Sequence, residues 1–160
     1  MQKKTIILAS DHAGFALKET IKAFLAEKGY KIDDVGAHKF KADDDYPEFM
    51  AAAAAKIATG EEENAKAIIF GGSGQGEAIV ANRFPGVRAV IWYGGGKALD
   101  GSGDSIIKLS REHNDANVLS IGARFVSEEE AKKAVIEWLE TPFNGEERHA
   151  RRIEEIDSIE

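Results

Sequence analysis

The sequence predicts an α/β fold, a Rossmann-like three-layer αβα sandwich around a mostly parallel sheet of about five strands. Short runs of branched apolar residues alternate along the chain with segments of helical periodicity, which is the element order of a parallel sheet covered by helices on both faces. The apolar runs show no polar alternation, as is typical of strands buried on both faces. A chain of 160 residues without an internal repeat or a linker favours one domain over residues 1–160.

Predicted strands and predicted helices follow one another along the chain. The strands are expected at residues 5–9, 30–35, 67–70, 87–91 and 118–121. The helices are expected at residues 17–28, 47–59, 77–82, 105–112, 127–139 and about 146–159. Their ends are indicated by Pro47 in a first turn, by Gly29 and Gly60 as C-terminal stops, and by the capping box Ser127-Glu130. The glycine-rich segment 93–103 is expected to be an irregular, mobile loop.

The composition excludes several classes of protein. The formal net charge of −7 argues against a general nucleic-acid binder. The absence of cysteine removes disulfides, thiolate metal sites and a cysteine nucleophile. The apolar run near the N-terminus is too short for a signal peptide or a membrane span, so we expect a soluble cytoplasmic protein that does not bind membranes.

Four groups of polar residues adjoin the predicted elements, and we expect all four at the carboxyl ends of the strands, where open parallel sheets bind ligands. The groups are Asp11-His12, the loop GGSGQGE at residues 71–77, His113-Asn114-Asp115, and the basic group Arg148, His149, Arg151 and Arg152. Arg148 and Arg152 are four residues apart and therefore share one face of the predicted last helix. Guanidinium groups in that arrangement suit a phosphate.

The loop GGSGQGE does not match the nucleotide-binding motifs. Its glycines, at positions 71, 72, 74 and 76, lack the spacing of the dinucleotide fingerprint, and the Gly-Lys-Ser/Thr ending of a P-loop is missing. The glycines still allow backbone N–H groups to converge on an anion. Beside the carboxylate of Glu77, the anion that fits best is an oxyanion that develops on a substrate.

Each of these residues also has a structural interpretation. Glu77 in the first turn of a helix stabilises the helix dipole by about 0.3–1 kcal/mol, and Asp11 is a candidate N-cap. Isolated histidines are more often structural than catalytic, and the arginine group fits a solvated helix face. A carboxylate base, an anion hole, histidines and a phosphate clamp, with no cofactor motif and no metal-ligand cluster, favour cofactor-free proton transfer on a sugar phosphate.

Several stretches of the chain resemble a known family, the type B ribose-5-phosphate isomerases, within the larger group that includes galactose-6-phosphate and allose-6-phosphate isomerases. The matching stretches, in order, are SDHAGFALK (10–18), DDDYPEF (43–49), GGSGQGEAIVANRFPGVRA (71–89), REHNDANVLSIGAR (111–124) and ERHARRI (147–153). The resemblance implies aldose–ketose isomerisation of a small sugar phosphate without a cofactor or metal. It also implies a homodimer, with a tetramer as the alternative, in which active sites are shared and the last helix packs on the partner subunit.

The resemblance also implies a role for each site residue. Some members carry a cysteine base at the start of the glycine loop, where this chain has Gly71, and others use a glutamate at its end, which matches Glu77. The implied catalytic residues are Glu77 as base, His113 for ring opening, Ser73 for the enediolate, and Asp11 near the sugar hydroxyls. The implied substrate-binding residues are His12, Tyr46, Gly72, Gly74, Gly76, Asn114, Arg124, Arg148, His149 and Arg152.

One segment departs from the family pattern. The connection from Ile91 to His113 is longer than is usual in the family, and we expect it to alter the preferred sugar length, to act as a lid, or to be an inert insertion. Two rival functions therefore remain. One is a hexose-6-phosphate isomerase, which acts on allose or galactose 6-phosphate, and the other is a non-catalytic sugar-phosphate sensor. Intact Glu77, Ser73 and His113 argue against the sensor, because a sensor needs only a phosphate clamp.

Overall fold

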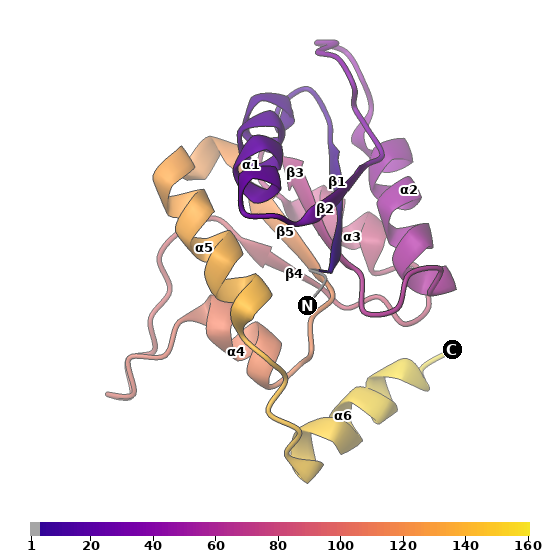
Figure 1. Cartoon of the computed structure of the whole chain (residues 1–160). Helices are drawn as coiled ribbons and strands as arrows, with labels where there is room; N and C mark the ends of the chain where they lie inside the picture. The colour runs from indigo at the N-terminus through magenta and orange to yellow at the C-terminus, as the bar shows by residue number, and fades with distance from the viewer. Residues whose placement is uncertain (1–3) are drawn as a thin grey trace.

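The structure is a computed structural model that describes residues 4–160 (Figure 1). Five parallel strands form one sheet in the order β2-β1-β3-β5-β4. The strands are β1 (Thr5–Ser10), β2 (Lys31–Asp34), β3 (Lys66–Gly71), β4 (Ala89–Trp92) and β5 (Val118–Gly122). The helices are α1 (Phe15–Glu27), α2 (Tyr46–Thr59), α3 (Gln75–Ala81), α4 (Ile106–Glu112), α5 (Glu128–Glu140) and α6 (Glu147–Asp157). The predicted α/β class with a five-stranded parallel sheet is confirmed.

Successive residues of the central strands feed two hydrophobic cores on opposite faces of the sheet. Ile6 and Leu8 of β1 pack with residues of α1, α4 and α5, whereas Ile7 and Ala9 pack with residues of α2 and α3. Figure 1 shows these two sets of helices on either side of the sheet. Full burial of an Ile or Leu side chain contributes roughly 1.5–3 kcal/mol, so a one-residue slip of β1 would disturb both cores.

The strand order brings two functional loops together. The chain passes from β1 to β2 on one side and later returns to β3 on the other side of β1, so the order reverses between β1 and β3. Ligands of open α/β sheets bind outside the carboxyl ends of the strands at such a point. The loops that follow β1 and β3 approach closely, because a Cβ atom on Gly14 would overlap the backbone of Phe70.

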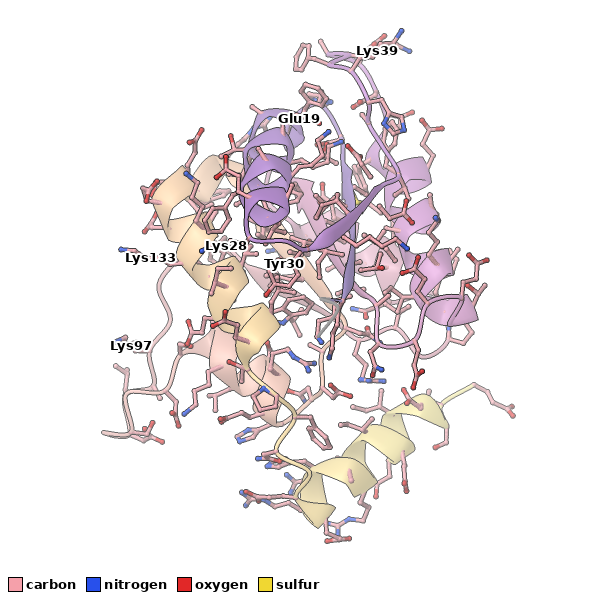
Figure 2. The ribbon with its side chains drawn as sticks, viewed as in Figure 1. Glu19, Lys28, Tyr30, Lys39, Lys97 and Lys133 are labelled. Carbon is pink, nitrogen blue, oxygen red and sulfur yellow. The ribbon has the colours of Figure 1, made fainter. Side chains whose placement is uncertain are left out.

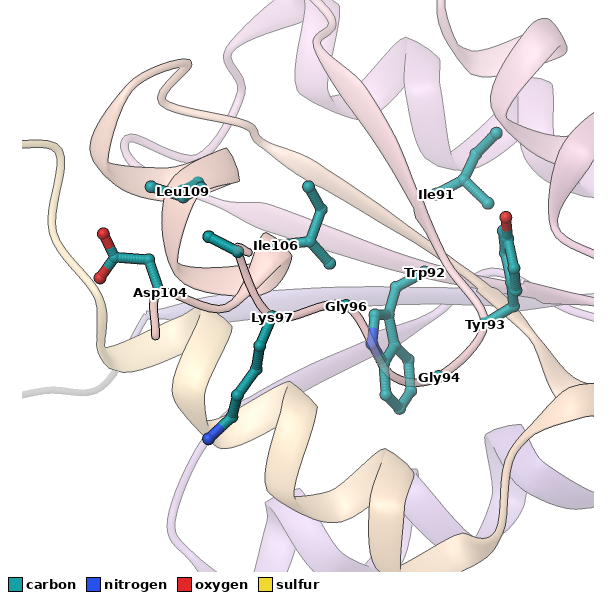
Figure 3. Close-up of a pocket in the computed structure, with 10 residues that line it drawn as sticks. Ile91, Trp92, Tyr93, Gly94, Gly96, Lys97, Asp104, Ile106 and Leu109 are labelled. Carbon is teal, nitrogen blue, oxygen red and sulfur yellow. The ribbon is translucent and has the colours of Figure 1, made fainter. Parts of the chain in front are cut away.

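The glycine-rich segment forms an arm that leaves β4 and returns to α4. Ala98 N donates to Asp104 O at 2.9 Å, and Ile106 N donates to Gly96 O at 2.9 Å, so the arm closes on itself like a short hairpin. Residues 93–103 form no helix or strand, in agreement with the predicted irregular loop, and one isolated bridge joins Lys97 to Ser105. The arm and the edge strand β4 enclose an open cavity of about 550 Å³, and Figure 3 shows Ile91 and Ile106 on its wall.

Helix α6 lies apart from the sandwich, beyond α4 (Figure 1). Its links to the rest of the described chain include the stacked rings of His149 and His113 and an ion pair of 3.3 Å between Asp157 and Arg88. Ile156 and Ile159, near the end of the chain, stay exposed. Within residues 4–160, none of the helices is long and apolar enough to cross a membrane.

Candidate functional site

Glu77 is a buried carboxylate at the carboxyl end of the sheet. It lies in the first turn of α3 and is 4% exposed. Burial raises the pKa of Glu77, and the negative charge of Asp11 raises it further, while a hydrogen bond from the Glu77 backbone lowers it. A carboxylate with a raised pKa holds a proton more readily than an exposed one, as a general base requires.

The Glu77 carboxylate lies directly over Gly71. A Cβ atom on Gly71 would overlap Oε1 of Glu77, so only a residue without a side chain fits beneath it. Gly71 is the position at which the cysteine-dependent members of the resembled family carry their base. In this chain the glutamate therefore occupies the space that a side chain at position 71 would need.

The glycine loop is shaped by conformation and by close neighbours. Gly74 has a φ of 78°, in the left-handed region that favours glycine, and its carbonyl accepts a hydrogen bond of 2.7 Å from Ser120 Oγ. A Cβ atom on Gly76 would overlap the hydroxyl of Tyr46, so this tyrosine covers the loop. Ser73 Oγ accepts a hydrogen bond of 3.3 Å from Gln75 N and remains beside the same loop.

Arg124 brings a positive charge to the loop from the end of β5. It lies in a single 3₁₀ turn (Ala123–Phe125), and its backbone nitrogen donates to Gly72 O at 3.1 Å. A Cβ atom on Gly72 would come within 3.1 Å of Arg124 Nη1, so the guanidinium group lies over this glycine. Glu77 and Arg124 thus flank one loop, which provides a base on one side and an anion ligand on the other.

Asp11 and His12 follow β1 at the same end of the sheet. Asp11 is 5% exposed, and its Oδ1 accepts a hydrogen bond of 3.1 Å from Gly14 N. The N-cap of α1 is Gly14, so the interpretation of Asp11 as the cap of this helix is wrong. His12 Nδ1 lies 2.7 Å from Asp44 Oδ1, and this hydrogen bond raises the pKa of His12.

His113 and His149 lie together at the opposite end of the sheet. His113 is the C-cap of α4, and its ring stacks on that of His149 with centroids 4.1 Å apart and planes 13° apart. His149 is 5% exposed, and its Nε2 has no hydrogen-bond partner within residues 4–160. Burial lowers the pKa of His149, and the neighbouring charges of His113 and Arg148 lower it further.

The expectation that all four groups lie at the carboxyl ends of the strands is wrong. Asp11-His12 and the glycine loop do follow strands, but His113-Asn114-Asp115 comes just before β5, and Asn117 N bonds to Arg88 O beside the start of β4. The helix with the basic group is tied to the same amino end through Arg88. The sequence held the signal for this, because a residue that precedes a strand in a parallel sheet lies at its amino end.

The described chain therefore carries two separate groups of the residues singled out in the sequence. One group surrounds the glycine loop: Asp11, His12, Tyr46, Gly72, Ser73, Gly74, Gly76, Glu77 and Arg124. The other group lies around the His113–His149 stack: His113, Asn114, Arg148, His149 and Arg152. A strand of five or six residues spans about 16–20 Å, so the two groups of one chain lie too far apart to touch one small ligand.

Sequence reasoning missed Asp44, which supports His12. Asp44 is 32 residues from His12 in the chain, and nothing in the local pattern distinguishes it from Asp43 and Asp45. Among residues 4–160, Asp11, His12 and Asp44 also bring possible metal ligands within 4.8 Å of one another. His12 Nδ1 and Asp44 Oδ1 are already joined by a hydrogen bond, so we assign no metal to them.

The doubly wound sheet and the buried carboxylate beside a glycine loop define an α/β enzyme that binds a small molecule at the carboxyl ends of its strands. Comparison with known proteins makes this specific. The chain belongs to the Ribose/Galactose Isomerase family, whose family model matches residues 6–156.

Individual relatives cover almost the whole chain. Ribose-5-phosphate isomerase B of Mycolicibacterium paratuberculosis is 40% identical over 149 residues, which are 93% of this chain and 87% of that protein. The Escherichia coli protein of the same name is 39% identical over 157 residues, 98% of this chain and 97% of that protein. The crystal structure of the Mycoplasma genitalium ribose-5-phosphate isomerase B with bound ribulose-5-phosphate matches with a TM-score of 0.87 and 34% identity, over 98% of this chain and 96% of that one.

Proposed function

We propose that the protein is an aldose–ketose isomerase that interconverts ribose 5-phosphate and ribulose 5-phosphate through an enediolate. The relatives named ribose-5-phosphate isomerase B support this reaction, at 39–40% identity over nearly full length. The observation that carries the proposal is Glu77, a buried carboxylate with a raised pKa, placed over Gly71 beside a loop of backbone amides. The reaction belongs to the pentose phosphate pathway, which would place the enzyme in the cytoplasm.

Glu77 is proposed to move one proton between two neighbouring carbons. In the open-chain aldose it removes the proton from C2, the electron pair of that bond forms a C1=C2 double bond, and the π pair of the C1 carbonyl moves onto O1, which gives the enediolate. The hydroxyl proton moves from O2 to O1, and Glu77 returns its proton to C1, which leaves the carbonyl at C2. The amides of Gly72, Gly74 and Gly76, with Ser73, would stabilise the charged oxygen, because they lie beside the base.

The remaining residues are proposed to open and hold the sugar phosphate. His113 would move a proton at the ring oxygen, Asn114 would stabilise the enediolate, and Asp11 and Tyr46 would contact the sugar. The phosphate would be held by His12, Arg124, Arg148, His149 and Arg152. A dianionic phosphate does not react, so these contacts mainly hold the sugar in register with the base.

We further propose that the enzyme is a homodimer in which each active site combines the two groups of residues from different chains. The polarity of the sheet supports this, since His113 precedes β5 while Glu77 follows β3, at opposite ends of parallel strands. Helix α6, which lies apart from its own sandwich, would then pack on the partner. Residues 1–160 would form one domain whose catalytic unit is completed only by a second copy.

A coupled assay with ribose 5-phosphate and allose 6-phosphate tests the reaction. Turnover of ribose 5-phosphate with a higher kcat/KM supports the proposal, and a preference for allose 6-phosphate would make the enzyme a hexose-6-phosphate isomerase. Binding without turnover of either sugar would indicate a sensor.

Complementation tests the shared site separately from the reaction. Chains with Glu77→Gln and chains with Arg148→Ala are each mixed with themselves and with one another after unfolding and refolding. In random mixed dimers one of the two sites is intact, so kcat/KM, measured at substrate concentrations well below KM, should recover to about a quarter of that of the wild type. No recovery, with mixed dimers confirmed by mass spectrometry, would show that both groups act within one chain.

A further inference from the structure

A polar pocket of about 410 Å³ opens at the amino ends of the strands, at the opposite end of the sheet from Glu77. Its wall is formed by residues at the starts of β1, β3, β4 and β5 and by the loop that precedes β3. Four cationic side chains line it, Lys4, Lys66, Arg88 and Arg111. The proposed isomerase reaction uses none of them.

Lys66 is the unusual member of this group. It is the first residue of β3 and is only 5% exposed. No carboxylate or carbonyl within residues 4–160 accepts a hydrogen bond or ion pair from its ammonium group. Burial lowers the pKa of Lys66 to about 7, and the positive charges of Arg111 and Lys4 contribute to the decrease.

A second buried lysine shows how this fold normally satisfies such a group. Lys18 is 0% exposed, and its Nζ donates to Asp34 Oδ1 at 2.7 Å and to Ala37 O at 2.6 Å. A buried ammonium with acceptors of this kind stays charged at modest cost, whereas one without them is costly. Lys66 thus differs from Lys18, because its side chain is largely buried yet lines an open pocket and has no protein acceptor among residues 4–160.

Three carboxylates, Glu62, Glu63 and Asp115, also line the pocket, and two of them are paired with other cations. Asp115 lies 2.7 Å from Arg111 and 3.6 Å from Arg88, which leaves it committed to the two arginines. Glu62 lies 2.9 Å from Lys31, and Lys31 does not line the pocket. Glu63 is exposed in the loop that precedes β3. None of the three forms an ion pair with Lys66 among residues 4–160, although the charge of Asp115 acts to raise the pKa of Lys66.

We propose that this pocket binds a small oxyanion, the phosphate or carboxylate group of a metabolite, with Lys66 as its central ligand. An oxyanion supplies the acceptors that the buried ammonium lacks, and it interacts favourably with the neighbouring guanidinium groups of Arg88 and Arg111. The volume leaves room for more than the anionic group alone. The residues that line this pocket differ from those proposed to bind the sugar phosphate, although His113 and Asn114 adjoin the pocket at the same end of the sheet.

Backbone amide NMR of the full-length protein tests this site, with inorganic phosphate and citrate as probes in separate titrations. At constant ionic strength, held with sodium chloride, phosphate should give saturable shifts at residues 65–67, which adjoin the pocket and not the proposed substrate site. Shifts near Gly72, Asn114 and Arg124 would report the proposed substrate site in the same spectra. A saturable response to citrate but not to phosphate would assign the pocket to carboxylates, and the reverse to phosphates.

The variant Lys66→Met keeps the length of the side chain and removes its charge. It should weaken binding at residues 65–67 by about tenfold or more, while the shifts near Gly72, Asn114 and Arg124 persist. The control is Lys133→Met, which removes an exposed lysine of α5 that points away from the sheet (Figure 2). If Lys66→Met does not fold, Lys66→Gln serves in its place. Absence of saturable shifts with both probes, or shifts that survive both substitutions at Lys66, would overturn the proposal.

Discussion

Asp44 Oδ1 lies 2.7 Å from His12 Nδ1 and 2.9 Å from the backbone nitrogen of the same residue. One carboxylate oxygen therefore fixes both the ring and the main chain of His12. The Asp44 side chain is 6% exposed, and the hydrogen bond that it accepts from the His12 ring is the largest cause of the raised pKa of His12. His12 thus stays cationic to a higher pH than a free histidine, which suits a ligand of a phosphate dianion.

The substitution Asp44→Asn should weaken substrate binding more than turnover. Loss of the negative charge lowers the pKa of His12 toward its ordinary value of about 6.5, so near pH 7.5 the ring becomes neutral. We expect KM for ribose 5-phosphate to rise by about tenfold at pH 7.5, with a smaller change in kcat. Steady-state kinetics between pH 6 and 8 would measure both.

The pH dependence separates this effect from simple damage to the loop. Near pH 6 the ring is cationic in both proteins, so the difference in KM should shrink. The control is Asp43→Asn, because the Asp43 side chain is 83% exposed and lies 3.9 Å from Lys41. A KM difference that stays constant across this pH range would contradict the role assigned to Asp44.

The substitution Glu77→Gln should leave substrate binding intact and remove most turnover. Proton transfer by a positioned base contributes about 10²–10⁴-fold, and the amide cannot accept the proton. In the wild type, activity should fall as the pH falls through the pKa of Glu77, because the base must be ionised. Since burial raises that pKa, the acidic limb should lie above the usual range of a glutamate. The exposed Glu48→Gln is the control, and near-normal kcat in Glu77→Gln would remove Glu77 as the base.

Arg148 and Arg151 form a matched pair on α6. Arg151 is held by Glu147 through two contacts of 2.8 and 2.9 Å, whereas Arg148 lies 2.9 Å from Glu146 and is 57% exposed. Arg148→Ala should lower kcat/KM by roughly 10- to 150-fold, mainly through KM, as expected for loss of a charge-assisted hydrogen bond. Arg151→Ala should resemble the wild type. If Arg148→Ala also resembles the wild type, α6 is only a solvated surface.

The added methyl group of Gly71→Ala tests the contact between Gly71 and Glu77. Gly71 is not among the residues with positive φ, so alanine changes contact rather than backbone conformation. The Cβ atom should displace the Glu77 carboxylate and lower kcat by about tenfold or more. In the double variant with Glu77→Gln the methyl group should lower kcat little further, because the base is already lost. Additive losses would show that Gly71→Ala acts through something other than Glu77.

Local patterns in the sequence predicted most of the fold but only part of the site. The apolar runs located all five strands to within two residues at each end, and the capping box of Ser127 and Glu130 is present at the start of α5. Glu77 could be singled out because it adjoins the glycine loop in the sequence. Asp44 and Lys66 could not, since the first depends on a contact across 32 residues and the second on a charged residue that continues a buried strand. Both depend on tertiary packing, which carries no local signature.

The overlap between Glu77 and a side chain at position 71 restricts how an enzyme of this kind can exchange one catalytic base for another. A cysteine introduced at position 71 would enter space that the glutamate already fills, so neither group would reach its working geometry. Loss of Glu77 first would leave the chain without a base. Each single substitution thus lowers activity, while the two together can restore it. A lineage that changes its base must therefore cross a less active intermediate or acquire both substitutions at once.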